Sequence, residues 1–349
     1  MRVERILPGA HPPASLEGSV LTRDLVAGGV RMPKGRRLSL EDLRALATDP
    51  AALGDGGVTV LVLEQGDVHE DDAAMSLADA VAGEGLTTRG PAQSRVDLVA
   101  AVDGVLHVRT AALERINRID PLEVFTAFDG SVVKAGQLVA SVKVAPHVVD
   151  EAVVEAGRRQ AGFGRRPIVR VAPFVPRRVG VVVREAIHSV ARERFEASVA
   201  DKVEGLGSTL IGITYAPDDA AVGGAMRELA SGRDRADVIL TAGGGSTDPA
   251  DPFYGAVEEL GGSVVRRGVP AHPGSMLWLG RIGRVAVLGL PTCGAYSKAT
   301  AADLVLPRLL TGERPGPRLV SGLGHGGLLT REQRFRFPAY ARELDAPDG

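Results

Sequence analysis

The second half of the chain alternates short apolar runs with amphipathic segments, and this alternation predicts strands and helices in turn. Apolar runs rich in β-branched residues fall at 179–183, 208–214, 236–241, 263–270, 276–281 and 284–290. Helical spacing separates or follows them at 187–206, 218–230 and 295–310. Near-continuous apolar strands between helices are typical of a parallel sheet covered on both faces. The pattern therefore predicts a doubly wound, mostly parallel α/β domain over residues 173–317.

The first half has a mixed pattern, which predicts a smaller α+β domain over residues 1–172. A capping box at Ser39-Leu-Glu-Asp42 opens one predicted helix. Further helices are predicted at 67–83, 111–118 and 146–160, and strands at 58–64 and 168–172. Asp103-Gly104 and Asp129-Gly130 lie between β-rich runs and predict two hairpins. The tail, 318–349, turns polar and Arg-rich after its glycines, so we expect it to lie over the surface, with its last residues disordered.

One loop stands out because polar groups follow a buried strand directly. Three glycines, a Ser-Thr pair and two aspartates succeed the run at 236–241: Gly243, Gly244, Gly245, Ser246, Thr247, Asp248 and Asp251. Glycines allow close backbone approach to a ligand, and free N–H groups with hydroxyls suit phosphate. The two carboxylates are candidate ligands for a divalent cation. Two simpler interpretations stay open, namely a plain strand-to-helix turn and an N-cap at Asp251, which precedes Pro252.

Composition narrows the classes of function. A net charge of −2 and an aromatic content of 4% argue against a nucleic-acid binder. The single cysteine, Cys293, excludes a disulfide framework within the chain and fits a reducing cytoplasm. The first 13 residues have no apolar h-region, and no segment is apolar enough to span a bilayer. We therefore expect a soluble, cytoplasmic protein with no membrane or nucleic-acid partner.

Several segments stand in an order that resembles a known family. They are Leu240-Thr-Ala-Gly-Gly-Gly-Ser-Thr-Asp-Pro-Ala-Asp251, Glu259-Leu-Gly-Gly262, Gly268-Val-Pro-Ala-His-Pro-Gly-Ser-Met276, Val287-Leu-Gly-Leu-Pro-Thr-Cys293, Leu304-Val-Leu-Pro-Arg-Leu-Leu310 and Leu323-Gly-His-Gly-Gly327. This order resembles the molybdopterin-binding domain shared by molybdopterin adenylyltransferases and molybdopterin molybdotransferases, and above all their stand-alone molybdopterin-binding relatives. The resemblance covers residues 179–327 well. It extends more weakly to 18–24 and 34–42, which are similar to the molybdotransferase N-terminal region.

The resemblance implies a role for several residues. The family's Gly-Gly loop ending in an aspartate matches Gly243, Gly244, Ser246 and Asp251, so Asp251 becomes a candidate for the nucleotidyl or metal step. Asp248, in an Asp-Pro similar to that of the stand-alone relatives, is a second catalytic or metal candidate. Further matches imply ligand contacts at His272, Pro273, Gly274, Pro291 and Glu185. The sequence departs from the family after Pro291, and we expect Thr292 and Cys293 in that turn to contact the rest of the ligand. The implied ligand is molybdopterin, with Mg²⁺ as a possible companion, and the implied assembly is a homo-oligomer.

Three candidates have simpler interpretations that remain open. Ser297 and Lys298 fall in the first turn of the helix predicted at 295–310, where phosphate is favoured, but they also suit a solvated helix end. Cys293 is by default a packing cysteine, and a lowered thiol pKa at the same helix start is a minor alternative. The arginine pairs at 165–166, 177–178 and 266–267 suit a solvated surface, although one pair is a candidate for the entrance to an anion site.

Two departures from the family favour binding over turnover. Ser275 and Met276 stand where the molybdotransferases have Lys and Pro, and of the family's Thr-Gly-Asp/Ser-Glu segment only Glu185 remains. The leading hypothesis is therefore a molybdopterin-binding protein in molybdenum-cofactor synthesis or delivery. The alternatives are an active molybdotransferase that releases AMP in a Mg²⁺-dependent reaction, a non-catalytic scaffold or chaperone for a molybdoenzyme, and, more distantly, a nucleotide-processing enzyme.

Overall fold

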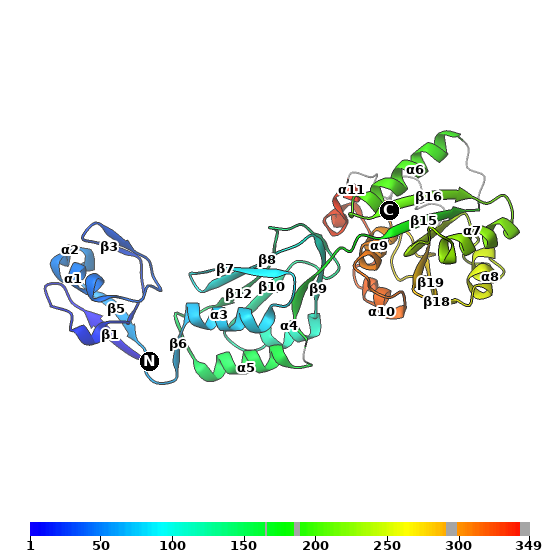
Figure 1. The fold of residues 1–349 in the computed structure, drawn as a ribbon. Helices are drawn as coiled ribbons and strands as arrows, with labels where there is room; N and C mark the ends of the chain where they lie inside the picture. The colour runs from blue at the N-terminus through cyan, green and yellow to red at the C-terminus, as the bar shows by residue number, and fades with distance from the viewer. Residues whose placement is uncertain (165, 185–188, 291–298, 343–349) are drawn as a thin grey trace. The chain divides into compact units, whose positions relative to one another are not determined.

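The structure is a computed structural model that describes residues 1–164, 166–184, 189–290 and 299–342. The chain divides into two compact units (Figure 1). Unit 1 comprises 1–102, 107–129 and 135–171, and unit 2 comprises 103–106, 130–134 and 172–349. No helix in the described part of the chain is long and apolar enough to cross a membrane.

Unit 2 is built on a six-stranded, mostly parallel sheet, as the sequence predicts. Its strands, in spatial order, are β16 (Thr209–Tyr215), β15 (Arg178–Val183), β17 (Val238–Ala242), β20 (Val285–Gly289), β19 (Trp278–Ile282) and β18 (Ser263–Arg267). The first four run parallel, whereas β19 is antiparallel to β20 and β18 is antiparallel to β19. Four longer helices flank the sheet: α6 (Ser189–Glu204), α7 (Asp219–Ser231), α8 (Pro252–Glu259) and α9 (Ala302–Leu310).

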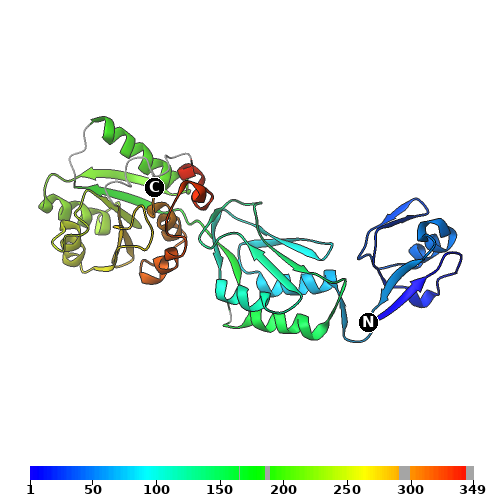
Figure 2. The same cartoon turned by 180° about the vertical axis from the view of Figure 1, so that it is seen from behind.

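Side chains of the central strands alternate between two apolar layers, which explains why helices cover both faces. In β15, Val181 and Val183 pack with α6 and α9, whereas Val182 packs with α7 and α8. In β17, Leu240 packs with α6 and α9, whereas Ile239 packs with α7 and α8. Successive residues of a strand point to opposite faces, so a strand buried on both sides is apolar throughout. Seen from two sides, α6 lies across one face of the sheet, and α7 and α8 lie across the other (Figure 2).

The described residues of the tail are mostly exposed, in keeping with the prediction, but several of its apolar side chains also enter the core. It forms α10 (Pro317–Val320), α11 (Ala339–Arg342) and the 3-10 helices η3 (Ser321–Gly324) and η4 (Arg331–Arg336). Leu319, Leu329 and Phe337 are buried in the apolar layer that contains α6 and α9. These apolar residues are spaced too irregularly among polar ones to produce a helical or strand period. The last residues, 343–349, lie outside the described part.

Unit 1 contains smaller sheets, hairpins and helices. Its elements begin with β1 (Arg2–Ile6), η1 (Ala14–Leu16), β2 (Val20–Leu21), β3 (Leu25–Ala27), β4 (Val30–Met32), α1 (Leu40–Thr48), α2 (Pro50–Leu53), β5 (Val58–Val62), β6 (Asp67–His69) and α3 (Glu70–Val81). They continue with β7 (Leu86–Ala92), β8 (Arg95–Ala100), α4 (Thr110–Asn117), β10 (Leu122–Thr126), β12 (Leu138–Val144), β13 (Val148–Asp150) and α5 (Glu151–Gly162). The capping box at Ser39 and Asp42 is confirmed.

Both predicted hairpins are wrong. The strands beside Asp103-Gly104 belong to separate sheets, since β8 pairs with β7 and β12, whereas β9 (Gly104–Val108) pairs with β11 (Val132–Val133) and lies in a sheet with β14 (Val169–Pro173). Gly104 serves close packing, because a Cβ there would lie 2.0 Å from the carbonyl oxygen of Ala172. Asp129 accepts a hydrogen bond from the Val108 N–H at 2.8 Å instead of closing a two-residue turn.

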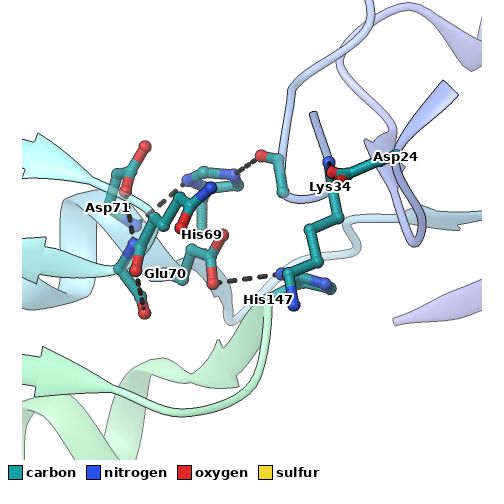
Figure 3. A network of polar contacts seen from close by, with 9 residues as sticks. Asp24, Lys34, His69, Glu70, Asp71 and His147 are labelled. Carbon is teal, nitrogen blue, oxygen red and sulfur yellow. Dashed lines mark hydrogen bonds and ion pairs between the residues drawn. The ribbon is translucent and has the colours of Figure 1, made fainter. Parts of the chain in front are cut away.

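A buried polar network ties the 33–37 loop of unit 1 to the start of α3 (Figure 3). His69 Nδ1 accepts from the Asp71 N–H, so its Nε2–H donates to the Gly35 carbonyl at 2.8 Å. Glu70, itself buried, contacts His147 Nδ1 at 3.0 Å. Gly35 must lack a side chain, because its φ is +80° and a Cβ would overlap the Glu70 carboxylate. These contacts hold the loop in place without any apolar core of its own.

Candidate functional site

The carboxyl ends of β15 and β17 form the switch point of the sheet in unit 2. From β15 the chain passes through α6 to β16 on one side, and then crosses to β17 on the other. Val183 pairs with Ala242, so the two strands end level. In open α/β sheets the ligand crevice lies beyond the strand ends at such a point. The loop that starts at Gly243 therefore opens where this fold binds ligands.

The loop from Gly243 to Thr247 presents free backbone donors. Gly243 has a φ of +82°, which glycine adopts without strain. Among the described residues, none of the five N–H groups from Gly243 to Thr247 has a hydrogen-bond acceptor. The loop is nevertheless held in place, because the Tyr254 hydroxyl donates to the Ser246 carbonyl at 2.7 Å. A fixed run of free N–H groups is suited to an anion such as phosphate.

Asp251 is both the N-cap of α8 and a buried carboxylate with one free oxygen. Its Oδ1 accepts from the Phe253 N–H at 2.8 Å, and Pro252 occupies the first helical position. The residue is 2% exposed, and Oδ2 has no hydrogen-bond partner in the described part of the chain. Burial raises the pKa of Asp251, the Phe253 N–H opposes that shift, and the charges of Asp248 and Asp219 add to it. The cap uses one oxygen and leaves the other buried without a partner among the described residues.

Replacing Asp251 with asparagine is expected to stabilise the fold at neutral pH. The raised pKa of Asp251 means that its contribution to stability is full below the ordinary Asp pKa of about 3.9 and is lost as the pH rises through the folded-state pKa. Asp251→Asn keeps an oxygen that accepts from the Phe253 N–H. Because the amide does not ionise, its contribution to stability does not fall as the pH rises. Chemical denaturation across pH 3–8 measures the difference, which should be absent at the acid end and grow toward neutrality. A pH-independent difference would contradict the assignment.

Asp248 lies in the same loop but is exposed, and its Oδ1 accepts from the Ala250 N–H at 2.9 Å. The described residues contain no group of three or more His, Cys, Asp or Glu side chains arranged for a metal. Mg²⁺ commonly takes one or two protein carboxylates and completes its shell with water and phosphate oxygens. Such a shared site needs only the carboxylates of Asp248 and Asp251, whereas the described part of the chain offers no cluster for an all-protein metal site.

The His272–Gly274 segment lies at the same edge of the sheet as the Gly243 loop. Trp278, the first residue of β19, pairs with Gly289, the last residue of β20. The segment that leads into β19 therefore lies at the edge of the sheet where β20 ends. The His272 side chain is exposed, and its main chain joins the tail through a hydrogen bond from its N–H to the Gly327 carbonyl at 2.7 Å. The two segments singled out by sequence, 272–274 and 323–327, are therefore hydrogen-bonded to each other.

The helix predicted at 295–310 begins later, because α9 starts at Ala302 and residues 299–301 are not helical. The Thr300 hydroxyl accepts from the Ala302 N–H, and the buried Asp303 carboxylate accepts from the Thr300 N–H. The first N–H group of α9 is thus satisfied within the chain, by the Thr300 hydroxyl. The phosphate contacts predicted at Ser297 and Lys298 stay a prediction. Glu185, Pro291, Thr292, Cys293, Ser297 and Lys298 lie outside the described residues.

Sequence reasoning missed two residues at this edge, Arg184 and Tyr254. Arg184 directly follows β15, its N–H donates to the Ala242 carbonyl, and its Nε contacts Asp219 at 2.9 Å. Tyr254, which holds the loop, packs edge-on against Trp278 with ring centroids 5.1 Å apart. The signal for Arg184 was its place after an apolar strand. No sequence period identifies Tyr254, because its role depends on the close approach of α8 to the loop.

These features define an α/β domain with an anion-suited loop at its switch point. Residues 179–311 match the family model described as "Probable molybdopterin binding domain". This match confirms the resemblance inferred from the sequence for that part of the chain. No curated protein matches the chain at a significant level.

Two solved structures are similar to parts of the chain. One is the molybdopterin biosynthesis enzyme MoaB from Thermus thermophilus, at 22% identity over 40% of this chain and 98% of that chain, with a TM-score of 0.30. The other is the molybdopterin biosynthesis moea protein from Pyrococcus horikosii, at 14% identity over 73% of this chain and 80% of that chain, with a TM-score of 0.29.

Proposed function

We propose that unit 2 binds molybdopterin, or its adenylated form, and that the protein acts in the synthesis or delivery of the molybdenum cofactor. The observation that carries the proposal, within the described part of the chain, is the run of five free N–H groups beside a buried carboxylate with an unpartnered oxygen, at the switch point. The family match over 179–311 supports the choice of ligand. A pterin phosphate is the anion that this combination would receive.

In this proposal the residues divide into two roles. The N–H groups of Gly243–Thr247 bind the phosphate, with the Ser246 and Thr247 hydroxyls as further donors. Asp251, and Asp248 beside it, hold Mg²⁺ against the phosphate oxygens or orient the adenylated form. When bound, the cation would supply charge stabilisation at a phosphoanhydride. Contacts from His272, and from the residues outside the described part, remain predictions of the family resemblance.

The site lacks a group that insertion of molybdate would need. Ser275 and Met276 lie at the same edge as the Gly243 loop, where a molybdotransferase would have Lys and Pro, so a cation for an oxyanion substrate is missing from that segment. Arg184 carries a guanidinium at this edge, but Asp219 already engages it at 2.9 Å. We therefore assign the site to holding the cofactor rather than to inserting molybdate.

Isothermal titration calorimetry with molybdopterin, in the presence and absence of Mg²⁺, tests the proposal on the full chain. We expect saturable binding that Asp251→Ala weakens by about tenfold or more, since a charged contact is worth about 1.5–3 kcal/mol. Glu258→Ala, which removes an exposed carboxylate of the same helix, is the matched control and should bind as the unaltered protein does. Absence of binding, or equal effects of the two variants, would refute the proposal. Molybdate-dependent release of AMP from adenylated molybdopterin would instead show turnover.

A further inference from the structure

Four arginines surround a groove at the amino ends of the parallel strands in unit 2. Arg177 precedes β15, Arg235 precedes β17, Arg284 lies in the turn between β19 and β20, and Arg314 follows α9. Three of these segments lead into parallel strands, so the groove lies at the sheet edge opposite the Gly243 loop. Strands of five or six residues separate the two edges by roughly 16–20 Å.

The four guanidinium groups are available to a ligand. Within the described ranges, none of them donates a hydrogen bond or forms an ion pair. By contrast, the neighbouring Arg178 is engaged by Asp234 and by the Arg235 carbonyl. Unpaired arginines are common on surfaces, but four that line one groove from four chain segments concentrate positive charge in a protein whose net charge is −2.

Of the two acidic residues in the lining, one is balanced by an arginine outside the lining and the other keeps its charge. Glu313 receives two hydrogen bonds from the Arg308 guanidinium, at 3.0 Å and 2.7 Å. Asp237 accepts from the Arg178 N–H at 2.9 Å. Glu313 is thus balanced by Arg308, whereas the Asp237 carboxylate keeps its charge, so the four arginines of the lining stand against one uncompensated carboxylate.

The shape of the groove suits a small molecule. Its volume is about 520 Å³, within the usual range for ligand pockets, and Leu260, Ile282 and Pro315 contribute an apolar part to its lining. Gly312, with a φ of +90°, leaves room for one of the arginines, since a Cβ there would lie 2.8 Å from Arg177 Nη2. A larger residue would push that guanidinium out of its position.

We propose that this arginine groove binds a small anion that carries two or more phosphate groups. A guanidinium has a planar fork of donors that matches phosphate oxygens two at a time. Four such forks exceed what one phosphate can accept, which favours a di- or triphosphate over a single phosphate. The apolar lining would contact the organic part of such a ligand. The two arginines of the pair at 177–178 therefore differ in role. Arg178 contacts Asp234 and the Arg235 carbonyl, whereas Arg177 lines this groove and not the entrance to the Gly243 loop.

Calorimetric titration of the full chain with inorganic triphosphate tests this proposal. We expect saturable binding that weakens as the salt concentration rises and that falls about tenfold in each of Arg284→Ala and Arg314→Ala. Arg227→Ala is the matched control, since it removes an exposed charge from α7 outside the groove, and should leave affinity unchanged. All four arginines are at least partly exposed, so thermal denaturation should show every variant folded.

A second variant separates this groove from the Gly243 loop. Gly244→Ala should leave triphosphate binding in the groove intact. If Gly244→Ala abolishes triphosphate binding and the arginine variants do not, the anion sits on the loop and the groove proposal is wrong. No saturable binding, or equal loss in Arg227→Ala and Arg284→Ala, would overturn it as well. Failure of molybdopterin binding with triphosphate binding intact would refute only the proposed function.

Discussion

Replacing Gly244 with alanine is expected to lower the affinity for molybdopterin by roughly 10- to 100-fold. A Cβ at this position would lie 2.5 Å from Asp251 Oδ2 and 2.9 Å from the Phe253 ring. Both neighbours are buried, at 2% and 1% exposure, so neither can move aside into solvent. Relieving such a clash costs about 1–3 kcal/mol, and the same energy taken from binding gives that loss of affinity.

Gly245→Ala is the control that separates this steric effect from a general loss of flexibility. A Cβ on Gly245 would meet only the Asp248 Cβ, at 3.5 Å, which is ordinary contact. Fluorescence titration with molybdopterin should therefore show near-normal binding for Gly245→Ala and weak binding for Gly244→Ala. Equal affinities in the two variants would show that the packing of Gly244 on Asp251 does not position the ligand.

The Gly243 loop also shows which parts of the molecule a sequence can predict. The strands before it were found because a strand buried on both faces is continuously apolar, and Val179–Val183 and Val238–Ala242 have that pattern. The position of the loop then follows from the general rule for doubly wound sheets. The N-cap at Asp251 is one of the two roles that the sequence leaves open, and its signal is local, an Asp followed by Pro.

What the sequence did not predict depends on contacts between distant segments. The hairpin signals at Asp103-Gly104 and Asp129-Gly130 describe local turn preference, but the neighbouring strands bury their apolar faces in other sheets. At the start of α9, the Thr300 hydroxyl accepts from the Ala302 N–H and the Asp303 carboxylate accepts from the Thr300 N–H, and both contacts depend on the folded segment. The arginine groove draws its four side chains from positions spread between 177 and 314, so no short motif contains it.

A buried ion pair between α6 and α9 is the other feature that no local pattern indicates. The Lys202 ammonium contacts the Asp303 carboxylate, and their side chains are 4% and 0% exposed. Asp303 also accepts from the Thr300 N–H at 2.9 Å. Lys202 Nζ lies 5.5 Å from the centroid of the Tyr340 ring, and burial raises the pKa of Tyr340 well above its usual value, so that residue stays neutral. The pair thus joins α6, the start of α9 and the tail helix α11.

Lys202→Met is expected to lower the free energy of unfolding by about 3–5 kcal/mol. The substitution leaves the Asp303 carboxylate buried without its cation, and breaking one side of a buried pair costs that amount. Lys202→Met combined with Asp303→Asn should recover most of the loss, because the amide carries no charge and its oxygen still accepts from the Thr300 N–H. Urea denaturation of the full chain measures both, with Asp234→Ala, which breaks an exposed pair, as the reference for a small effect. If Lys202→Met costs no more than Asp234→Ala, or if the double variant is less stable than the single one, the ion pair does not hold these three elements together.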